Sequence, residues 1–411
     1  MVGVAVGLGN VWRFPYMTGR FGGAAFVLLY VAVIAVVGVP ALMAEWTLGR
    51  RTRRGPVGAY ARAGLPGGRL LGWCLFGAVA VATGYYTNVV GWVGWHALAA
   101  VLGFRPHHIL PPDTGVDARS LLLQVACTGG LLFAAAFVLR RGLRRGVERT
   151  SRLLTPLLFA TLVVVAIRAM TLPGAGAGVA WYLGGVGVDG LTPDVALAAL
   201  GHGVFSLALG GTFMVVYGSY LPDDQPLGRN AALTVAGDTM AGLLAGFAIF
   251  PAVFAAGLEP ASGPTLLFET LPAVFAALPA GRLFGTCFYV GLMGVAFLSV
   301  TGALEVLIAG LTDNTRCSRR QAVAIASVGV LALALPPMVN LRIFVPWDLA
   351  FGSGVQTFGA FMAVVTVGWA LQRSEAIREF GHPALYLWLR WVIPLAVAGV
   401  GAWWVGTELV A

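Results

Sequence analysis

The sequence predicts an all-α integral membrane protein with about eleven transmembrane helices. Hydrophobic residues make up 58% of the 411 residues and charged residues only 10%. Uncharged runs at 21–44, 70–104 and 349–372 are each long enough for the ~20 residues that cross the hydrocarbon. Further apolar runs begin near positions 120, 153, 195, 231, 283, 321 and 392. Together with the opening segment, these runs predict a single transmembrane domain over residues 1–411.

The formal charge of +9 comes from arginine, because the sequence contains no lysine. The arginines gather in short loops after the second, fourth, eighth and tenth expected spans. They are Arg50, Arg51, Arg53, Arg54, Arg140, Arg141, Arg144, Arg145, Arg316, Arg319, Arg320, Arg373 and Arg378. By the positive-inside rule these loops are cytoplasmic. We therefore expect a protein of the cell membrane whose N-terminus lies in the cytoplasm and whose C-terminus lies outside the cell. Because the arginines lie in loops between spans, they set the orientation of the chain in a lipid bilayer. We therefore expect no nucleic acid partner.

Several other site classes lack their sequence signature. Cys74, Cys127, Cys287 and Cys317 form no CxxC pair, so neither a zinc site nor a disulfide framework is indicated. The segment 185–190 matches GxGxxG in letters but follows no expected strand, which argues against a nucleotide site. No HExxH motif or nucleophile elbow is present, so we expect neither an enzyme nor an organic cofactor. We also expect no cleavable signal peptide.

Glycines interrupt two of the expected spans beside a side-chain oxygen. In the first span Gly7 and Gly9 precede Asn10, and in the sixth span Ser206 precedes a glycine pair at 210–211. Irregular backbone at membrane depth survives only where it lines a protein cavity. Interruptions at matching places indicate a five-plus-five inverted repeat with helices 1 and 6 unwound at the midplane around a transport site. The repeats would cover about 1–170 and 191–372, with an extra helix at about 384–409.

The stretch GLGNVWRFPY at residues 7–16 resembles the first-helix signature of the neurotransmitter:sodium symporter family. The resemblance continues through Glu45-Trp46, Gly49-Arg50, Tyr85-Tyr86, Phe205-Ser206-Leu207, Asp238 and Ile249-Phe250-Pro251. Within this family, the chain resembles the bacterial eleven-span branch, which includes the bacterial leucine transporter. The resemblance implies secondary active transport, with sodium-coupled symport by alternating access.

The resemblance also implies the substrate site. The substrate-binding positions are Val4, Ala5, Leu8, Gly9, Ala82, Tyr86, Phe205, Ser206, Ala208, Gly211, Ser299 and Ala303. An amino-acid carboxylate would accept hydrogen bonds from the backbone N–H groups near Leu8 and Gly9 and from the hydroxyl of Tyr86. Relatives that carry amines have an aspartate at the position of Gly7, so this glycine indicates an amino acid. The small residues of the side-chain pocket predict a bulky apolar or aromatic one.

Two sodium sites follow from the same resemblance. The first would use the backbone of Ala5 with Asn10, Ser206 and Asp238, and the carboxylate of Asp238 predicts chloride-independent transport. The second would use Gly3, Val6, Val295 and Ser299. It lacks one ligand, because Leu298 stands where the family has an oxygen-bearing side chain. Near the outer gate, His202 either titrates near neutral pH or is a hydrogen-bonded core residue.

The resemblance further implies an outer gate formed by Arg13 and Asp348 with Tyr86 and Phe205. A lone intramembrane arginine costs ~3 kcal/mol on insertion scales, so Arg13 needs such a partner, water or an interfacial position.

The family has an inner half-helix before the glycines, and the few residues after Met1 are too short for one. We therefore expect an internal start in the recorded chain, with Asp313 and Tyr220 at the positions of the inner-gate partners.

Three other functions remain open beside sodium-coupled symport. A proton-coupled amino-acid carrier on the same fold is compatible with the missing ligand at Leu298, and so is a non-transporting sensor or inactive relative. A membrane-embedded enzyme would need a use for Glu45 and Glu305 in the second and eighth spans. We expect these two acids to form buried structural pairs instead. The sequence does not indicate the oligomeric state.

Overall fold

The computed structural model describes residues 7–104, 106, 108–141, 144–185, 190–261, 263–276 and 280–410, and the regular elements in these ranges are helices. Within these ranges, eight helices are long and apolar enough to cross a membrane, or nine if one pair bent by 116° is a single span. This confirms the predicted all-α membrane class. The predicted total of eleven also includes the first and sixth helices, which the structure builds from shorter pieces.

The eight candidate spans are Ala24–Thr52, Gly68–Leu102, Ala118–Arg140, Leu227–Ala255, Gly281–Asn314, Arg319–Val339, Leu341–Ala370 and Pro383–Trp403. The first of these joins α3 (Ala24–Val33), a π-helical turn at Ile34–Gly38 and α4 (Val39–Thr52). Five of the spans are each formed by one continuous helix, namely α6 (Gly68–Leu102), α7 (Ala118–Arg141), α12 (Leu227–Ala255), α14 (Gly281–Asn314) and α15 (Arg319–Val339). The last two spans contain α16 (Leu341–Trp347), α17 (Val355–Val365), α19 (Pro383–Leu387) and part of α20 (Ile393–Val410).

Shorter or bent helices complete the chain. The bent pair consists of α8 (Arg144–Met170) and α9 (Ala175–Leu183). The opening segment forms a π-helical turn, η1 (Gly9–Arg13), and continues as α2 (Phe14–Arg20). The sixth helix consists of α10 (Pro193–Ser206) and α11 (Phe213–Ser219). The remaining helices are α5 (Pro56–Arg62), α13 (Leu266–Ala276) and α18 (Arg373–Phe380).

Local sequence explains where several of these helices begin and end. Helix α15 begins with a capping box in which Ser318 and Gln321 satisfy each other's backbone N–H groups. Helix α10 begins at Pro193 after Thr192, whose side chain accepts a hydrogen bond from the backbone of Val195. Helix α6 ends at Leu102 and is followed by Gly103, which adopts a φ of +78° that favours glycine.

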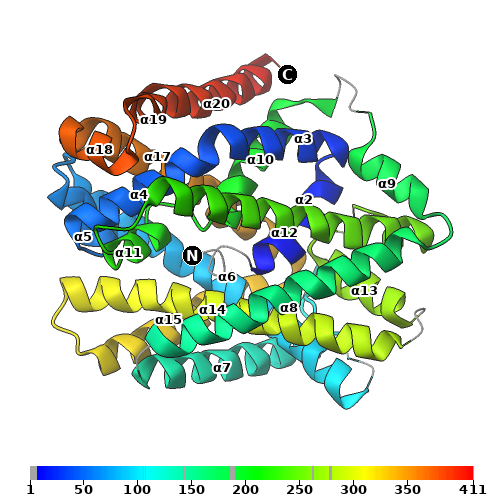
Figure 1. Cartoon of the computed structure of the whole chain (residues 1–411). Coiled ribbons are helices and arrows are strands. Elements are labelled where there is room, and N and C mark those ends of the chain that lie inside the picture. The colour runs from blue at the N-terminus through cyan, green and yellow to red at the C-terminus, as the bar shows by residue number, and fades with distance from the viewer. Residues whose placement is uncertain are drawn as a thin grey trace.

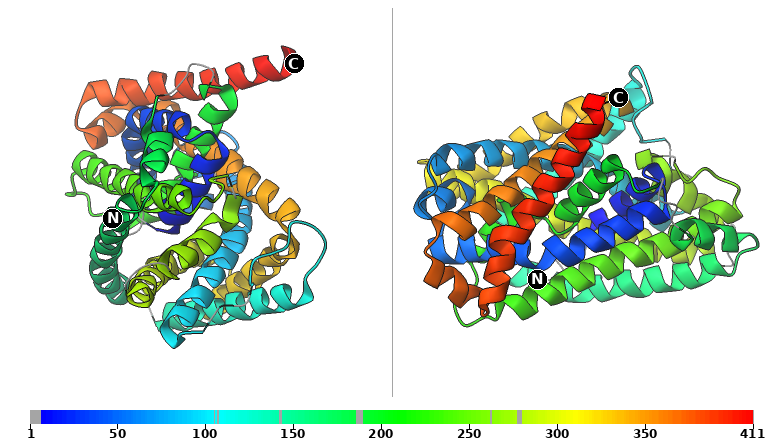
Figure 2. Two further views of the ribbon diagram at one scale, coloured as in Figure 1. Left: turned by 90° about the vertical axis from the view of Figure 1, so that its right-hand side faces the viewer. Right: turned by 90° about the horizontal axis from the view of Figure 1, so that it is seen from above.

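Most helices run side by side along one direction (Figure 1), and α20 lies along the edge of the bundle away from α7 (Figure 2). Helix α6 packs against α14, α15 and α5, whereas α12 packs against α8, α9 and α4. The turn η1 contacts both α10 and α12, and α17 contacts α6 and α10. The broken sixth helix and the opening segment therefore meet inside the bundle, between α6 and α12.

Candidate functional site

The sixth helix is interrupted between Ser206 and Phe213. The backbone turns sharply there, with φ values of +52° at Ala208, +143° at Gly210 and +70° at Gly211. A Cβ atom at Gly211 would lie 2.0 Å from the hydroxyl oxygen of Tyr60, so both φ and space require glycine at this position. The break leaves backbone polar groups that need partners within the protein.

Glu45 and Tyr60 supply those partners. The Oε1 atom of Glu45 accepts hydrogen bonds of 2.8 Å from the backbone N–H groups of Gly210 and Gly211. The hydroxyl of Tyr60 donates to the carbonyl oxygen of Gly211 at 2.8 Å. The partners of the fully buried Glu45 are thus backbone groups, not a second side chain. Glu305 does form a side-chain pair, because both its oxygens lie within 3.0 Å of the Arg319 guanidinium, but Arg319 is 42% exposed, so this pair is not the buried one expected from the sequence.

A buried polar cluster connects the opening segment, α10 and α12. The Nδ2 atom of Asn10 donates to the Ser206 hydroxyl at 3.0 Å and to the Asp238 carboxylate at 2.7 Å. The Ser206 hydroxyl also lies 2.9 Å and 2.8 Å from the two Asp238 carboxylate oxygens. The hydroxyl of Tyr30 contacts the same carboxylate at 3.4 Å. The structure therefore brings Asn10, Ser206 and Asp238 together, as the sequence predicts.

This cluster contains a carboxylate without a cationic partner. Asp238 is fully buried, and it forms no ion pair within the described part of the chain. A buried carboxylate is costly unless a cation or several hydrogen bonds compensate it. Ser206 contributes a hydroxyl oxygen beside it, whereas the side-chain oxygen of Asn10 accepts a 2.8 Å hydrogen bond from the backbone N–H of Gly7. Oxygen is the ligand type that hard cations prefer. The oxygens of Asp238 and Ser206 are therefore of the type that a sodium ion prefers.

A cavity opens beside the cluster at the break of the sixth helix. Eight of the predicted substrate-binding residues line it: Gly9, Ala82, Tyr86, Phe205, Ser206, Ala208, Ser299 and Ala303. Tyr86 contacts the Ser299 side chain and the backbone of Leu8, which places its hydroxyl near the start of the first helix. Glycines, polar side chains and alanines therefore share the lining of one cavity.

Other predicted residues lie elsewhere. Gly211 is not part of the lining, because it packs against Tyr60 and donates to Glu45. Gly3, Val4, Ala5 and Val6 fall outside the described residues, so their predicted contacts stay predictions.

The sequence reasoning missed six lining residues: Val79, Thr83, Leu209, Thr212, Phe213 and Gln356. Gly7, which the sequence already associates with the substrate, also lines the cavity. Thr83 follows Ala82 directly, and Leu209, Thr212 and Phe213 follow the Phe205-Ser206 pair in the break. Their proximity in the chain to predicted residues was therefore an available signal. Gln356 had no such signal, because it lies on α17, far in sequence from the other lining residues.

The predicted outer-gate residues lie together above the cavity. The Nε atom of Arg13 lies 2.8 Å from Oδ1 of Asp348, and both side chains are fully buried. Asp348 also accepts a hydrogen bond from Tyr16, and Arg13 donates to Ser353 at 2.8 Å. The Arg13 guanidinium lies 4.4 Å from the centre of the Phe205 ring, whose edge faces Tyr86. The gate residues are therefore in contact, and this end of the cavity is closed.

The predicted second sodium site has few oxygen atoms among the described residues. The hydroxyl of Ser299 donates to the carbonyl of Val295 at 3.3 Å. Leu298 is buried with 8% of its surface exposed, and it offers only its backbone carbonyl, which accepts from Thr301 at 2.8 Å.

His202 is a buried core residue, but without the hydrogen bonds expected of one. Both its ring nitrogens are buried and have no hydrogen-bond partner among the described residues. Its ring lies 5.3–5.9 Å from the rings of Phe14, Phe26 and Tyr30.

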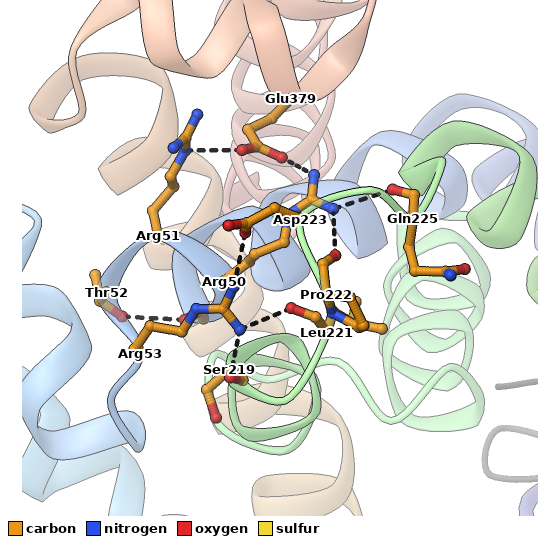
Figure 3. A network of polar contacts seen from close by, with 11 residues as sticks. Arg50, Arg51, Thr52, Arg53, Ser219, Leu221, Pro222, Asp223, Gln225 and Glu379 are labelled. Atoms are coloured by element: carbon orange, nitrogen blue, oxygen red, sulfur yellow. Dashed lines mark hydrogen bonds and ion pairs between the residues drawn. The ribbon is translucent and has the colours of Figure 1, made fainter.

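At the end of α4 far from the Arg13–Asp348 pair, an arginine network joins three segments (Figure 3). Glu379 on α18 forms ion pairs with Arg50 and with Arg51, the second at 2.7 Å. Arg50 also donates to the carbonyl oxygens of Pro222 and Gln225, at 3.2 Å and 3.0 Å, in the connection between α11 and α12. This network therefore ties α4 to both α18 and the end of the sixth helix.

The predicted inner-gate partners lie near the same end. Asp313 accepts a hydrogen bond of 3.4 Å from the backbone N–H of Gly55, and Tyr220 follows α11 directly.

Comparison with known proteins agrees with this architecture. The profile of the Sodium:neurotransmitter symporter family matches residues 1–106 and 119–382. An uncharacterised sodium-dependent transporter of Bacillus subtilis (strain 168) is 32% identical over 420 aligned positions, which cover 96% of this chain and 93% of that protein. An uncharacterised sodium-dependent transporter of Haemophilus influenzae is also 32% identical, over 97% of this chain and 94% of that protein.

A solved structure shows the same fold. The crystal structure of MhsT in complex with L-phenylalanine superposes with a TM-score of 0.88 and 31% sequence identity, over 98% of this chain and 96% of that one. The family profile covers most of the chain, and the relatives exceed 30% identity across nearly their whole length. The chain therefore belongs to the sodium:neurotransmitter symporter family, and it is a sodium-dependent membrane transporter rather than an enzyme.

Proposed function

We propose that the chain carries a bulky apolar or aromatic amino acid together with sodium, by alternating access and without chloride. One observation carries this proposal: the buried Asn10–Ser206–Asp238 cluster reaches, through Ser206, a cavity whose lining is largely apolar. A zwitterionic ligand with an apolar side chain matches that distribution, because its charged end needs polar partners and its side chain needs apolar ones.

The carboxylate of the substrate lies beside this cluster in the proposal. The backbone N–H groups of Leu8 and Gly9 and the hydroxyl of Tyr86 donate hydrogen bonds to it, as helix N-termini do to anions. The contact between Tyr86 and the backbone of Leu8 supports this arrangement. Sodium then lies between the substrate carboxylate and the side chains of Asn10, Ser206 and Asp238, so that each ligand increases the affinity for the other.

Size and relatives support an aromatic or large aliphatic side chain. Ala82, Ala208 and Ala303 line the cavity and leave room that larger residues would fill. The structurally similar protein MhsT was crystallised with L-phenylalanine. Glycine or alanine competing better than tryptophan for binding would contradict this part of the proposal.

Alternating access requires that the two ends of the cavity open in turn. The closed Arg13–Asp348 pair forms the outer barrier in this proposal, and the Glu379 network holds the opposite, cytoplasmic end. The N-terminus then lies in the cytoplasm and the C-terminus outside the cell. The two five-span repeats, residues 1–170 and 191–372, rock against each other around the unwound segments.

A proton-coupled carrier is the second candidate, and one observation favours it: Leu298 gives the second ion site no side-chain oxygen. Purified protein in liposomes distinguishes the two candidates. Labelled L-phenylalanine is offered under an inward sodium gradient at equal pH, and separately under an inward proton gradient without sodium. We expect accumulation only under the sodium gradient. Accumulation under the proton gradient alone would favour the second candidate, and binding without accumulation under either gradient would indicate a non-transporting protein.

A further inference from the structure

The walls of the cavity are not wholly apolar. Thr83, Thr212 and Gln356 line it together with the alanines, and none of the three is among the residues assigned to the carboxylate or the ion. The hydroxyl of Thr83 already donates to the carbonyl of Val79 at 2.7 Å within its own helix. The other two polar side chains have no such bond.

Gln356 presents an amide without a partner to this space. Its side chain makes no hydrogen bond within the described ranges, although the residue is partly buried. Its Cβ and Cγ atoms lie 3.4 Å from the position that a Cβ of Gly210 would take, so the break in the sixth helix gives it room. An amide held in a cavity without a partner costs free energy until a ligand supplies one.

Thr212 adds a hydroxyl from a different element. It precedes the first residue of α11, where a threonine side chain usually caps the helix, but its side chain makes no capping hydrogen bond. Only 3% of its surface is exposed. Gln356 and Thr212 therefore offer hydrogen-bonding groups to the same cavity, from α17 and from the start of α11.

We propose that Gln356 and Thr212 form a polar contact for the side chain of the substrate, and that the protein selects aromatic amino acids with a hydrogen-bond donor on the ring. The indole N–H of tryptophan or the hydroxyl of tyrosine donates to the Gln356 amide oxygen, and Thr212 supports that contact. Phenylalanine fits the same space but leaves the amide unpaired. This inference rests on the proposed amino-acid transport, and it adds the chemical class of the substrate side chain.

The size of the preference follows from the energetics of one neutral hydrogen bond. Such a bond contributes roughly 1 kcal/mol, which corresponds to roughly fivefold in affinity, and the unpaired amide adds to the difference. Because Gln356 is only partly buried, we expect tryptophan and tyrosine to bind about tenfold more tightly than phenylalanine, not thousands-fold.

Competition binding tests this inference. Sodium-dependent binding of labelled L-tryptophan to the purified protein is competed with unlabelled tryptophan, tyrosine and phenylalanine. In Gln356→Met, which keeps the length of the side chain, we expect the preference to fall to about twofold because tryptophan and tyrosine lose affinity and phenylalanine does not. Thr212→Val should reduce the preference partly. Thr83→Val is the matched control, because its hydroxyl is already bonded, and it should leave the preference unchanged.

The outcomes separate this inference from the proposed function. Equal affinities for the three amino acids in the unmodified protein would overturn the inference while leaving sodium-coupled transport intact. An equal loss of all three affinities in Gln356→Met would also overturn it, because that result indicates a gate residue. If no amino acid bound in a sodium-dependent way, the proposed function would fail first. Should Gln356→Met not fold, Thr212→Val and the unmodified protein still decide the matter.

Discussion

Ser206 and Asp238 lie on different helices, and the Ser206 hydroxyl is 2.9 Å and 2.8 Å from the two carboxylate oxygens of Asp238. This relationship links the break in the sixth helix to α12. Any ion that binds Asp238 therefore contacts the same segment that lines the cavity. In the proposed function, the coupling between ion and substrate depends on this link.

Asp238→Asn should make transport depend on chloride. The fixed carboxylate supplies a negative charge beside sodium, and its neutral amide does not. We expect uptake by the variant to fall at least tenfold when chloride is replaced by gluconate, while uptake by the unmodified protein does not change. Ser206→Ala is the control, because it removes a ligand but keeps the charge. Full uptake by Asp238→Asn in gluconate would contradict the assigned role of Asp238.

Asp348→Asn should open the outer end of the cavity. Removing one partner of a buried ion pair costs about 3–5 kcal/mol, because the Arg13 charge stays buried. In the variant, the closed conformation is destabilised by that free energy relative to an open conformation in which water reaches Arg13. A cysteine introduced at Ala82, in a background without the native cysteines, reports this opening. Its rate of labelling by a water-soluble maleimide is the measurement.

We expect faster labelling of Ala82→Cys in the Asp348→Asn background. Ser353→Ala removes only the neutral contact to Arg13, so it should change the labelling rate much less. Equal rates in all three backgrounds would show that the Arg13–Asp348 pair is not a barrier.

Glu45→Ala should destabilise the break in the sixth helix. It leaves the buried N–H groups of Gly210 and Gly211 without an acceptor, at about 1–3 kcal/mol for each group. Glu45→Gln keeps a side-chain oxygen and should remain within about 1 kcal/mol of the unmodified protein. Thermal unfolding in detergent compares the variants. If alanine and glutamine at this position are equally stable, the hydrogen bonds to the glycines do not hold the break.

Glu379→Gln should loosen the end of the cavity opposite the Arg13–Asp348 pair. The Glu379 side chain is 7% exposed and pairs with Arg50, which is 4% exposed, so losing its charge leaves a buried arginine. We expect faster release of bound substrate into the liposome lumen. Asp223→Asn is a matched control, since the Arg53–Asp223 pair is 45% and 82% exposed and contributes at most about 1 kcal/mol. Equal release rates in the two variants would contradict a gating role for Glu379.

Leu298→Thr should strengthen the dependence on sodium. It adds a hydroxyl oxygen beside Val295 and Ser299, where the structure has a buried leucine. We expect the concentration of sodium at half-maximal uptake to fall several-fold and the sodium dependence to become steeper. Valine has nearly the shape of threonine without the hydroxyl oxygen, so Leu298→Val should change neither value. If threonine and valine behave alike, sodium does not bind at this position.

The sequence predicts two members of the Asn10–Ser206–Asp238 cluster from local signals. Asn10 follows the glycines of the opening motif, and Ser206 precedes the break that Gly210 and Gly211 produce. Glycines that interrupt an apolar run are visible without any tertiary information. The pairing of these residues with Asp238 followed from family resemblance, and the packing of η1 and α10 on α12 places the three together.

The remaining contacts depend on packing between distant segments. Glu45 binds backbone groups of Gly210 and Gly211, which lie more than 160 residues away in the chain, and backbone N–H groups carry no sequence signature. Gln356 lines the cavity because α17 packs against α6 and α10. His202 is enclosed by rings from α2 and α3, so its missing hydrogen bonds could not be predicted from its neighbours in the chain.

Equilibrium binding at different sodium concentrations tests the central claim most directly. If the cavity holds the amino-acid carboxylate and sodium together, linkage requires each to raise the affinity for the other. The Kd for labelled L-phenylalanine should therefore fall at least tenfold when N-methylglucamine is replaced by sodium, and this change should be largely lost in Asn10→Ala. A Kd that does not change with sodium, or that changes equally in Asn10→Ala, would contradict the claim.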